Sequence, residues 1–126
     1  MARSSRSRRF DPKQVDRKDM RSVYVASPYT IGPCARNVST QIEAFHRLMD
    51  MGLLPFAPLL THYAEIHRQR PWEDWIHNYC LPWVSKCDMV LRLEGLSIGG
   101  DLEVQQAHRL NIPVYFGWQD LEESLG

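Results

Sequence analysis

Short runs of β-branched and aromatic residues alternate with longer segments of helical spacing along most of this chain, and this alternation is the strongest constraint on its fold. Strands separated by helices imply right-handed crossovers, which produce a parallel sheet with helices on both faces. The pattern therefore predicts a small doubly wound (flavodoxin-like) α/β fold with four to five strands. Pro55 removes a ladder donor from the second run and predicts an edge strand there. The predicted strands are residues 23–26, 53–57, 88–93 and 113–116.

Helical spacing fills the gaps between these strands. Residues 38–49 place apolar side chains at steps of four, three and four, which is the spacing of one helical face, and Gly52 supplies a left-handed stop. Residues 72–87 are rich in tryptophan at helical spacing, and Pro82 predicts a bend or a division within them. A last helix is predicted over residues 98–110. The side chains on the first helical face are Val38, Ile42, Phe45 and Met49.

The formal net charge of zero hides an uneven distribution. Residues 1–21 contain eight Lys or Arg and three Asp, whereas residues 22–126 contain seven Lys or Arg and twelve Asp or Glu. The first segment has almost no apolar periodicity, so we expect a disordered or loosely attached basic tail before one domain of residues 22–126. The alternative is a nucleic-acid-binding arm. Because no basic patch continues from the tail into the domain, we expect no nucleic-acid partner.

The composition also excludes several classes of protein. The longest nearly continuous apolar stretch, residues 51–60, contains two prolines and is much shorter than the roughly 20 residues that span a bilayer. No apolar run follows the arginine-rich start, so it does not resemble a secretory signal. Three cysteines are too few, and odd in number, for a disulfide scaffold. We therefore expect a cytoplasmic protein without a membrane segment.

The most informative polar loop leads into the last predicted helix. Gly99 and Gly100 let a ligand approach the backbone closely, and the unpaired N–H groups of a helix N-terminus suit a phosphate or sugar oxygen. Glu103 projects from the first helical turn. The alternative is that Asp101 and Glu103 only complement the helix dipole. Ligands bind beyond the carboxyl ends of parallel strands, so three loops should converge on one pocket. These loops are residues 27–30, 60–63 and 94–101.

Four motifs follow one another along the domain: Ser22-Val-Tyr-Val-Ala-Ser-Pro-Tyr29, then Asn37 opening a helix, then Cys87-Asp88 before a strand, then Ser97-x-Gly99-x-x-x-Glu103. In this order and spacing they resemble the nucleoside 2-deoxyribosyltransferase superfamily, including its nucleoside 5'-monophosphate N-glycosidase branch. The resemblance covers residues 22–116. The chain looks most like the small bacterial and phage members of this superfamily whose function is unassigned.

The resemblance implies roles for individual residues. Glu103 matches the nucleophile that attacks the anomeric carbon of a (deoxy)ribosyl group with overall retention, and its place at a helix N-terminus predicts an ionised carboxylate. Tyr24 matches the tyrosine that orients this glutamate, the alternative being a core tyrosine. Ser97 stands where transferases place an aspartate and monophosphate hydrolases a serine, and a neutral hydroxyl suits a 5'-phosphate. The further substrate contacts expected are Gly99, Gly100, Ser27, Tyr29, Asn37, Arg36 and His62.

One position departs from the superfamily pattern. Cys80 stands where the resemblance implies a second acid, and Asp74 is the nearest carboxyl on the same predicted helix, although helical geometry turns it away. The function that we expect is cleavage or transfer at the N-glycosidic bond of a nucleoside 5'-monophosphate or related nucleotide. The alternative is a nucleotide-binding module without turnover, and Cys80 favours it.

We expect no cofactor and no metal, because the spacing of the histidines and cysteines matches no usual zinc site. The partners expected are a small nucleoside or nucleotide and further copies of this chain. Members of the superfamily commonly build sites at subunit contacts, and residues 72–87 offer more apolar surface than one small sheet covers. We therefore expect a dimer or tetramer. The residues weighed as zinc ligands are His62, His67, His77, Cys80 and Cys87.

Overall fold

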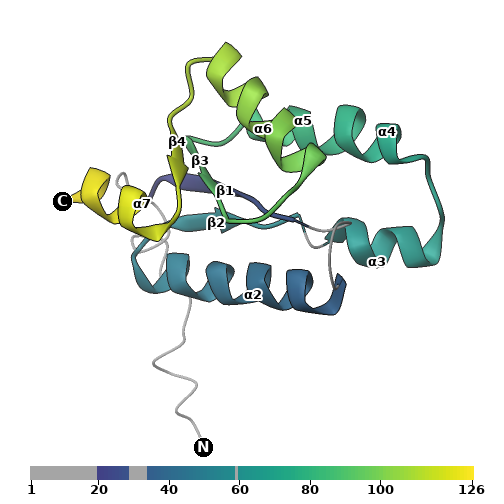
Figure 1. Ribbon diagram of the computed structural model, residues 1–126, viewed down its shortest axis with the longest axis horizontal. Coiled ribbons are helices and arrows are strands. Elements are labelled where there is room, and N and C mark those ends of the chain that lie inside the picture. Colours follow the sequence, from purple (N-terminus) through teal and green to yellow (C-terminus); the bar gives the residue numbers. More distant parts are fainter. Residues whose placement is uncertain (1–19, 29–33, 59) are drawn as a thin grey trace, which may run out of the picture.

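The computed structural model describes residues 20–28, 34–58 and 60–126, so most of the expected basic tail and the expected contact residue Tyr29 lie outside the described residues. Within the described residues the fold is α/β, with a parallel sheet of four strands in the order β2-β1-β3-β4 (Figure 1). The predicted doubly wound, flavodoxin-like fold is confirmed. The strands are β1 (Ser22–Ala26), β2 (Leu54–Phe56), β3 (Met89–Arg92) and β4 (Val114–Phe116).

The first strand in the chain lies inside the sheet. Ser22 pairs with Leu54 on one side of β1, and Val23 pairs with Met89 on the other. The β-branched and aromatic residues of β1 suit this place, because four of its five residues are buried. Pro55 lies in β2 at the edge of the sheet, where a missing ladder donor costs least, as predicted.

Helices cover both faces of the sheet (Figure 1). Successive side chains of β1 point to opposite faces, so Val23 and Val25 join one core cluster while Tyr24 and Ala26 join the other. Tyr24 therefore faces the layer that contains the helix predicted over residues 98–110. The Val23 face packs against α2 (Cys34–Asp50) and α7 (Trp118–Leu125), and the Tyr24 face against η2 (Ile76–Cys80), α5 (Leu81–Val84) and α6 (Ile98–Arg109).

Two helices were not predicted from the sequence, whereas the division of the tryptophan-rich segment agrees with the prediction. A helix, α3 (Leu60–His67), begins where a polar loop is expected, because the segment contains neither glycine nor proline after Pro58. The tryptophan-rich segment is divided before Pro82, since α4 (Trp72–Trp75) passes into the π-helical turn η2, and Pro82 has no N–H for a regular helical bond. The C-terminal helix α7 has no counterpart in the prediction.

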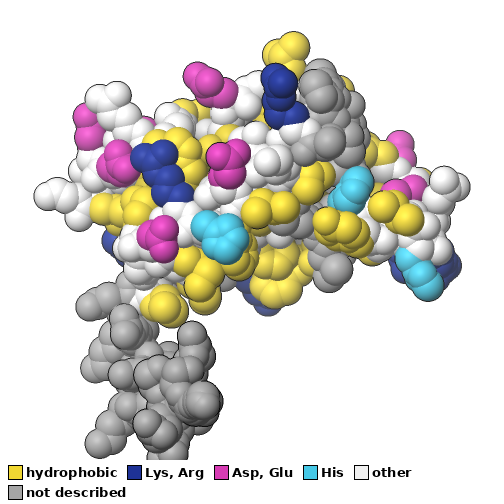
Figure 2. Space-filling model, turned by 90° about the horizontal axis from the view of Figure 1, so that it is seen from below, with side chains coloured by type: hydrophobic (Ala, Val, Ile, Leu, Met, Phe, Trp, Pro, Cys, Tyr) yellow, Lys and Arg dark blue, Asp and Glu magenta, His cyan; other side chains and the backbone are white. Residues whose placement is uncertain are grey.

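The face of α2 that packs on the sheet is not the most apolar face. Gln41, Ala44 and Leu48 are buried, whereas Ile42 and Met49, on the face singled out from the sequence, are exposed. The small side chain of Ala44 lets the helix lie close to the sheet. Figure 2 views the molecule from the side of α2 and shows hydrophobic side chains on this surface. No helix among the described residues is long and apolar enough to cross a membrane.

Candidate active site

A cavity of about 290 Å³ lies beyond the carboxyl ends of the strands, where the sheet order reverses between β1 and β3. One side of it is built by the start of α6 and by α4 and η2 from the layer on the Tyr24 face. The other side is built by α2, α3 and the residue that follows β1. Five residues expected from the sequence line this cavity: Ser27, Ser97, Gly99, Gly100 and Glu103.

Tyr24 contacts Glu103, which lines the cavity. The Tyr24 hydroxyl donates a hydrogen bond of 2.6 Å to Oε2 of Glu103, and both side chains are buried. Burial, and then the charge of Glu103, raise the pKa of Tyr24 well above its ordinary value, so the phenol remains the donor. Tyr24 therefore holds Oε2 and fixes the orientation of the carboxylate.

The ionisation of Glu103 differs from the prediction made from the helix dipole. Burial raises the pKa of Glu103 to about 7, although the hydrogen bond from Tyr24, the charge of Arg92 and the thiol of Cys80 each act to lower it. Desolvation is the largest of these effects because the carboxyl is taken out of water. The carboxyl is therefore only partly ionised at neutral pH in the empty site.

Cys80 occupies the place of the expected second acid as a buried thiol beside Glu103. Burial, and then the neighbouring charge of Glu103, raise the pKa of Cys80 to about 12. The group stays protonated at neutral pH and is a hydrogen-bonding neighbour of the Glu103 carboxylate. A thiol with such a pKa is too weak an acid to protonate a leaving base.

Arg92, at the end of β3, connects the sheet to the start of α6. Its side chain is buried and donates hydrogen bonds to the carbonyl oxygens of Leu93 and, at 2.8 Å, of Gly95. A longer contact of 3.3 Å reaches the exposed carboxylate of Asp101. A Cβ atom at Gly100 would lie 3.0 Å from Nε of Arg92, so only glycine fits there without displacing the guanidinium.

Ser97 has a structural role as well as a place in the cavity. It is the N-cap of α6, and its Oγ accepts a hydrogen bond of 2.9 Å from the N–H of Gly100. The hydroxyl proton of Ser97 is not used in this bond, so the same side chain can still donate to a ligand.

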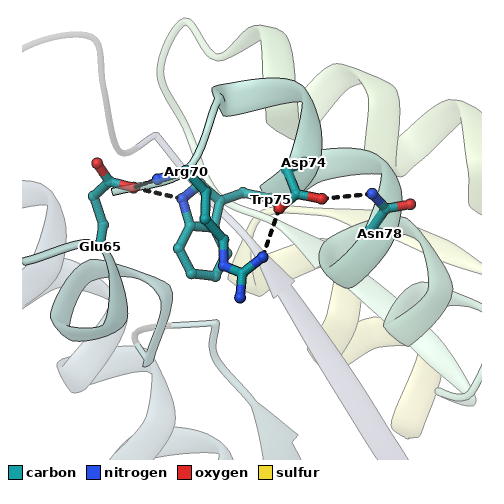
Figure 3. Close-up of polar contacts among 5 residues, drawn as sticks. All are labelled: Glu65, Arg70, Asp74, Trp75 and Asn78. Atoms are coloured by element: carbon teal, nitrogen blue, oxygen red, sulfur yellow. Dashed lines mark hydrogen bonds and ion pairs between the residues drawn. The ribbon is translucent and has the colours of Figure 1, made fainter. Parts of the chain in front are cut away.

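Residues from α3 and α4 form a polar network that sequence reasoning missed (Figure 3). Oε1 of Glu65 accepts hydrogen bonds from the backbone N–H of Arg70 at 3.0 Å and from Nε1 of Trp75 at 2.7 Å. These bonds, the first of them more strongly, lower the pKa of Glu65. Glu65 lines the cavity and stays ionised at neutral pH. Recognising it from sequence requires a helix at residues 60–67, because only a helix brings Glu65 round to Trp75.

Asp74 does not take the place of the missing acid. Its carboxylate accepts hydrogen bonds from Asn78 at 2.6 Å and from Arg70 at 2.9 Å, and these bonds lower its pKa (Figure 3). Asp74 is also absent from the described lining of the cavity. Both of its oxygens are therefore occupied by neighbours on the surface of α4 and η2.

The remaining expected contacts are spread more widely. Arg36 and Asn37 in α2 and His62 in α3 are not among the described residues that line the cavity. Asp88 lies just before the amino end of β3, away from the carboxyl ends that face the cavity. There it accepts hydrogen bonds from the N–H and hydroxyl of Ser22. No group of three or more His, Cys, Asp or Glu residues that could hold a metal ion occurs among the described residues.

Comparisons with known proteins agree with this architecture. A family model described as a domain of unknown function (DUF7768) matches residues 21–117. The solved structure of a 2-deoxyribosyltransferase from the bacterium Bacillus psychrosaccharolyticus is similar to this chain, with a TM-score of 0.60 and 20% sequence identity. The similarity covers 75% of this chain and 69% of that chain, and at this identity it shows a shared fold alone. No curated protein matches the sequence.

Proposed function

This chain belongs to the DUF7768 family, whose description names no reaction, and from its site we propose that it cleaves or transfers at the N-glycosidic bond of a nucleoside 5'-monophosphate or related nucleotide. The observation that carries the proposal is the hydrogen bond from the buried Tyr24 to Glu103, which lines the cavity. A buried carboxylate that is held by one oxygen has a defined direction of attack. The related fold of a 2-deoxyribosyltransferase supports the same class of reaction.

In the proposed reaction, ionised Glu103 attacks the anomeric carbon through Oε1. The new carbon–oxygen bond forms as the carbon–nitrogen bond breaks, and the base leaves with the electron pair of that bond. Water or a second base then attacks the same carbon, the bond to Glu103 breaks, and the free carboxylate returns. Two displacements retain the configuration of the sugar. Because Cys80 is too weak an acid, the leaving base takes its proton from water.

The same proposal assigns the 5'-phosphate to the start of α6. The hydroxyl of Ser97 and the backbone N–H groups near Gly99 lie at the positive end of the helix and line the cavity. We expect a monophosphate to bind more tightly than its nucleoside by about 1.5 to 3 kcal/mol, as charge-assisted hydrogen bonds provide. Calorimetry with both ligands measures the difference.

Replacing Ser97 with aspartate is the matched change, because it places a like charge beside the phosphate and should reverse the preference. Equal affinity of the wild-type protein for nucleoside and monophosphate would remove the phosphate from the proposal. Turnover is tested separately, by incubation with ribo- and deoxyribonucleoside monophosphates and chromatography for released base. No release from any of them would contradict the reaction.

A nucleotide-binding module without turnover is the second candidate. The observation in its favour is Cys80, which keeps its proton where the resemblance implies a second acid. This candidate predicts nucleotide binding with no released base, so the chromatographic experiment separates it from the enzyme.

We also propose that the protein works in the cytoplasm as a homo-oligomer, a dimer or a tetramer. The exposed apolar side chains of Ile42 and Met49 on the outer face of α2 provide surface that a second copy would cover (Figure 2). Sedimentation velocity at micromolar concentration should show a species of at least twice the chain mass of 14.7 kDa. A single monomeric species would contradict this proposal.

A further inference from the structure

Two buried oxygen atoms beside the cavity have no hydrogen-bond partner among the described residues. They are Oγ of Ser27 and Oε1 of Gln41, and each residue is more than nine-tenths buried, with exposed fractions of 7% and 5%. Both residues line the cavity, and Gln41 belongs to α2, which packs on the face of the sheet opposite to α6 and Glu103. A buried polar atom without a partner is costly, so such atoms beside a cavity indicate that a ligand supplies the partner.

Gln41 is the more informative of the two. It lies on the buried face of α2 in line with Ala44 and Leu48, at a position where an apolar side chain would pack at no polar cost. The sequence does not indicate it, because the larger apolar side chains of α2 lie on the neighbouring face. The last torsion of a glutamine side chain is soft, so a rotation about it can turn the buried Oε1 toward a ligand in the cavity.

The rest of this side of the cavity also presents acceptors. Glu65 is ionised, and both of its hydrogen bonds end on Oε1, so Oε2 has no partner among the described residues. Thr61 already donates its hydroxyl proton to the carbonyl oxygen of Pro58, so it offers only lone pairs to the cavity. A ligand that contacts Oε2 of Glu65 must therefore supply N–H or O–H donors, whereas the guanidinium of Arg70, which also lines the cavity, is held by Asp74.

We propose that the side of the cavity formed by Ser27, Gln41 and Glu65 reads the base, and that the substrates carry an exocyclic amino group. This inference rests on the proposed function, in which Glu103 contacts the sugar and Ser97 contacts the phosphate on the other side of the cavity. An amino group offers two N–H donors to these acceptors. A carbonyl oxygen at the same position could accept from the hydroxyl of Ser27, but it would face the ionised carboxylate of Glu65 with lone pairs only.

The test compares nucleotides that differ only at this position of the base. Cytidine and uridine monophosphates have the same sugar and phosphate, so a difference in affinity between them arises at the base. By calorimetry, the wild-type protein should bind the cytidine nucleotide about tenfold more tightly or better. Equal binding of the two, or tighter binding of the uridine nucleotide, overturns the inference.

Three variants separate recognition from structure. Gln41→Met keeps the shape of the side chain without its oxygen, so it should reduce the preference to below about threefold mainly by weakening the cytidine nucleotide. Gln41→Glu keeps an acceptor and should keep the preference. Gln105→Met makes the matched change on an exposed part of α6 and should leave it unaltered. Equal weakening of both nucleotides by Gln41→Met overturns the inference.

The Tm of the variant, measured without ligand, shows whether the variant is folded. Because Gln41→Met removes a buried acceptor that lacks a partner, it should raise the Tm of the empty protein by about 3 °C or more, and a lower Tm overturns the inference. Failure of the proposed function is distinguishable. A wild-type protein that prefers the cytidine nucleotide but releases no base contradicts the reaction alone, whereas base release without any preference in binding overturns this inference alone.

Discussion

Replacing Glu103 with glutamine should abolish base release while leaving nucleotide binding largely intact. The glutamine keeps the shape of the side chain and can still accept the hydrogen bond from Tyr24, but its amide oxygen is too weak a nucleophile to form the covalent intermediate. We expect the rate to fall by about a thousandfold or more, since the lost interaction is made only as the bond to the base breaks. Comparable rates for the two proteins would exclude a covalent mechanism through this residue.

The same substitution should stabilise the folded protein above pH 7. The pKa of Glu103 is about 7 in the folded protein against an ordinary value of 4.5, so between these values the folded state binds more protons than the unfolded state. The stability of the wild-type protein therefore falls as pH rises through this window, by up to about 3 kcal/mol. Glutamine has no charge to bury and does not share this loss.

Urea unfolding at pH 4.5 and at pH 8 measures the effect. The advantage of Glu103→Gln should be small at the lower pH and large at the higher pH, while Glu94→Gln at an exposed position should show no such growth. An advantage that does not grow with pH would mean that the buried charge costs little. Base release by the wild-type protein should itself rise with pH through about 7, because attack requires the ionised carboxyl.

Replacing Arg92 with methionine should lower the free energy of unfolding by about 3 kcal/mol. The buried carbonyl oxygen of Leu93 and the half-buried one of Gly95 lose their donors, and each such loss costs about 1 to 3 kcal/mol. The charge of Arg92 lowers the pKa of Glu103, so its removal should also shift the pH midpoint of base release upward. Thermal unfolding and the pH profile of kcat/KM measure the two effects.

Asp101→Asn is the matched control for Arg92. It removes only the exposed partner at 3.3 Å, and an exposed ion pair contributes at most about 1 kcal/mol. Arg92→Lys keeps the positive charge but loses the planar set of N–H donors of the guanidinium. It should therefore destabilise the fold but shift the pH midpoint of base release less. A stability of Arg92→Met equal to that of the wild-type protein would show that the two carbonyl groups find other donors.

Local sequence patterns were sufficient to predict the strands but not the way the helices dock. The run around Tyr24 is β-branched and aromatic because it is buried on both faces, and that signal is local. The buried face of α2 depends instead on the close approach that Ala44 allows, which no count of apolar residues reveals. The most apolar face of α2 is therefore not the face that packs on the sheet.

The candidate site was predicted where a motif names the residue and missed where only tertiary packing places it. Glu103 and Ser97 were singled out by the resemblance to the superfamily, and both line the cavity. Gln41 and Glu65 reach the same cavity from helices on its other side, and their local sequence has no feature that marks a ligand contact. The pKa of Glu103 was also misjudged, because the helix dipole is local whereas desolvation depends on everything packed around the carboxyl.

The central place of the first strand has a consequence for how the chain acquires its structure. During synthesis β1 leaves the ribosome first, but Leu54 and Met89, which pair with its first two residues, follow about 30 and about 65 residues later. Until β3 is made, the backbone N–H and C=O groups on one edge of β1 have no partner and are open to other chains. With every strand pair parallel and distant in sequence, the chain should refold slowly, and dilution should improve its yield.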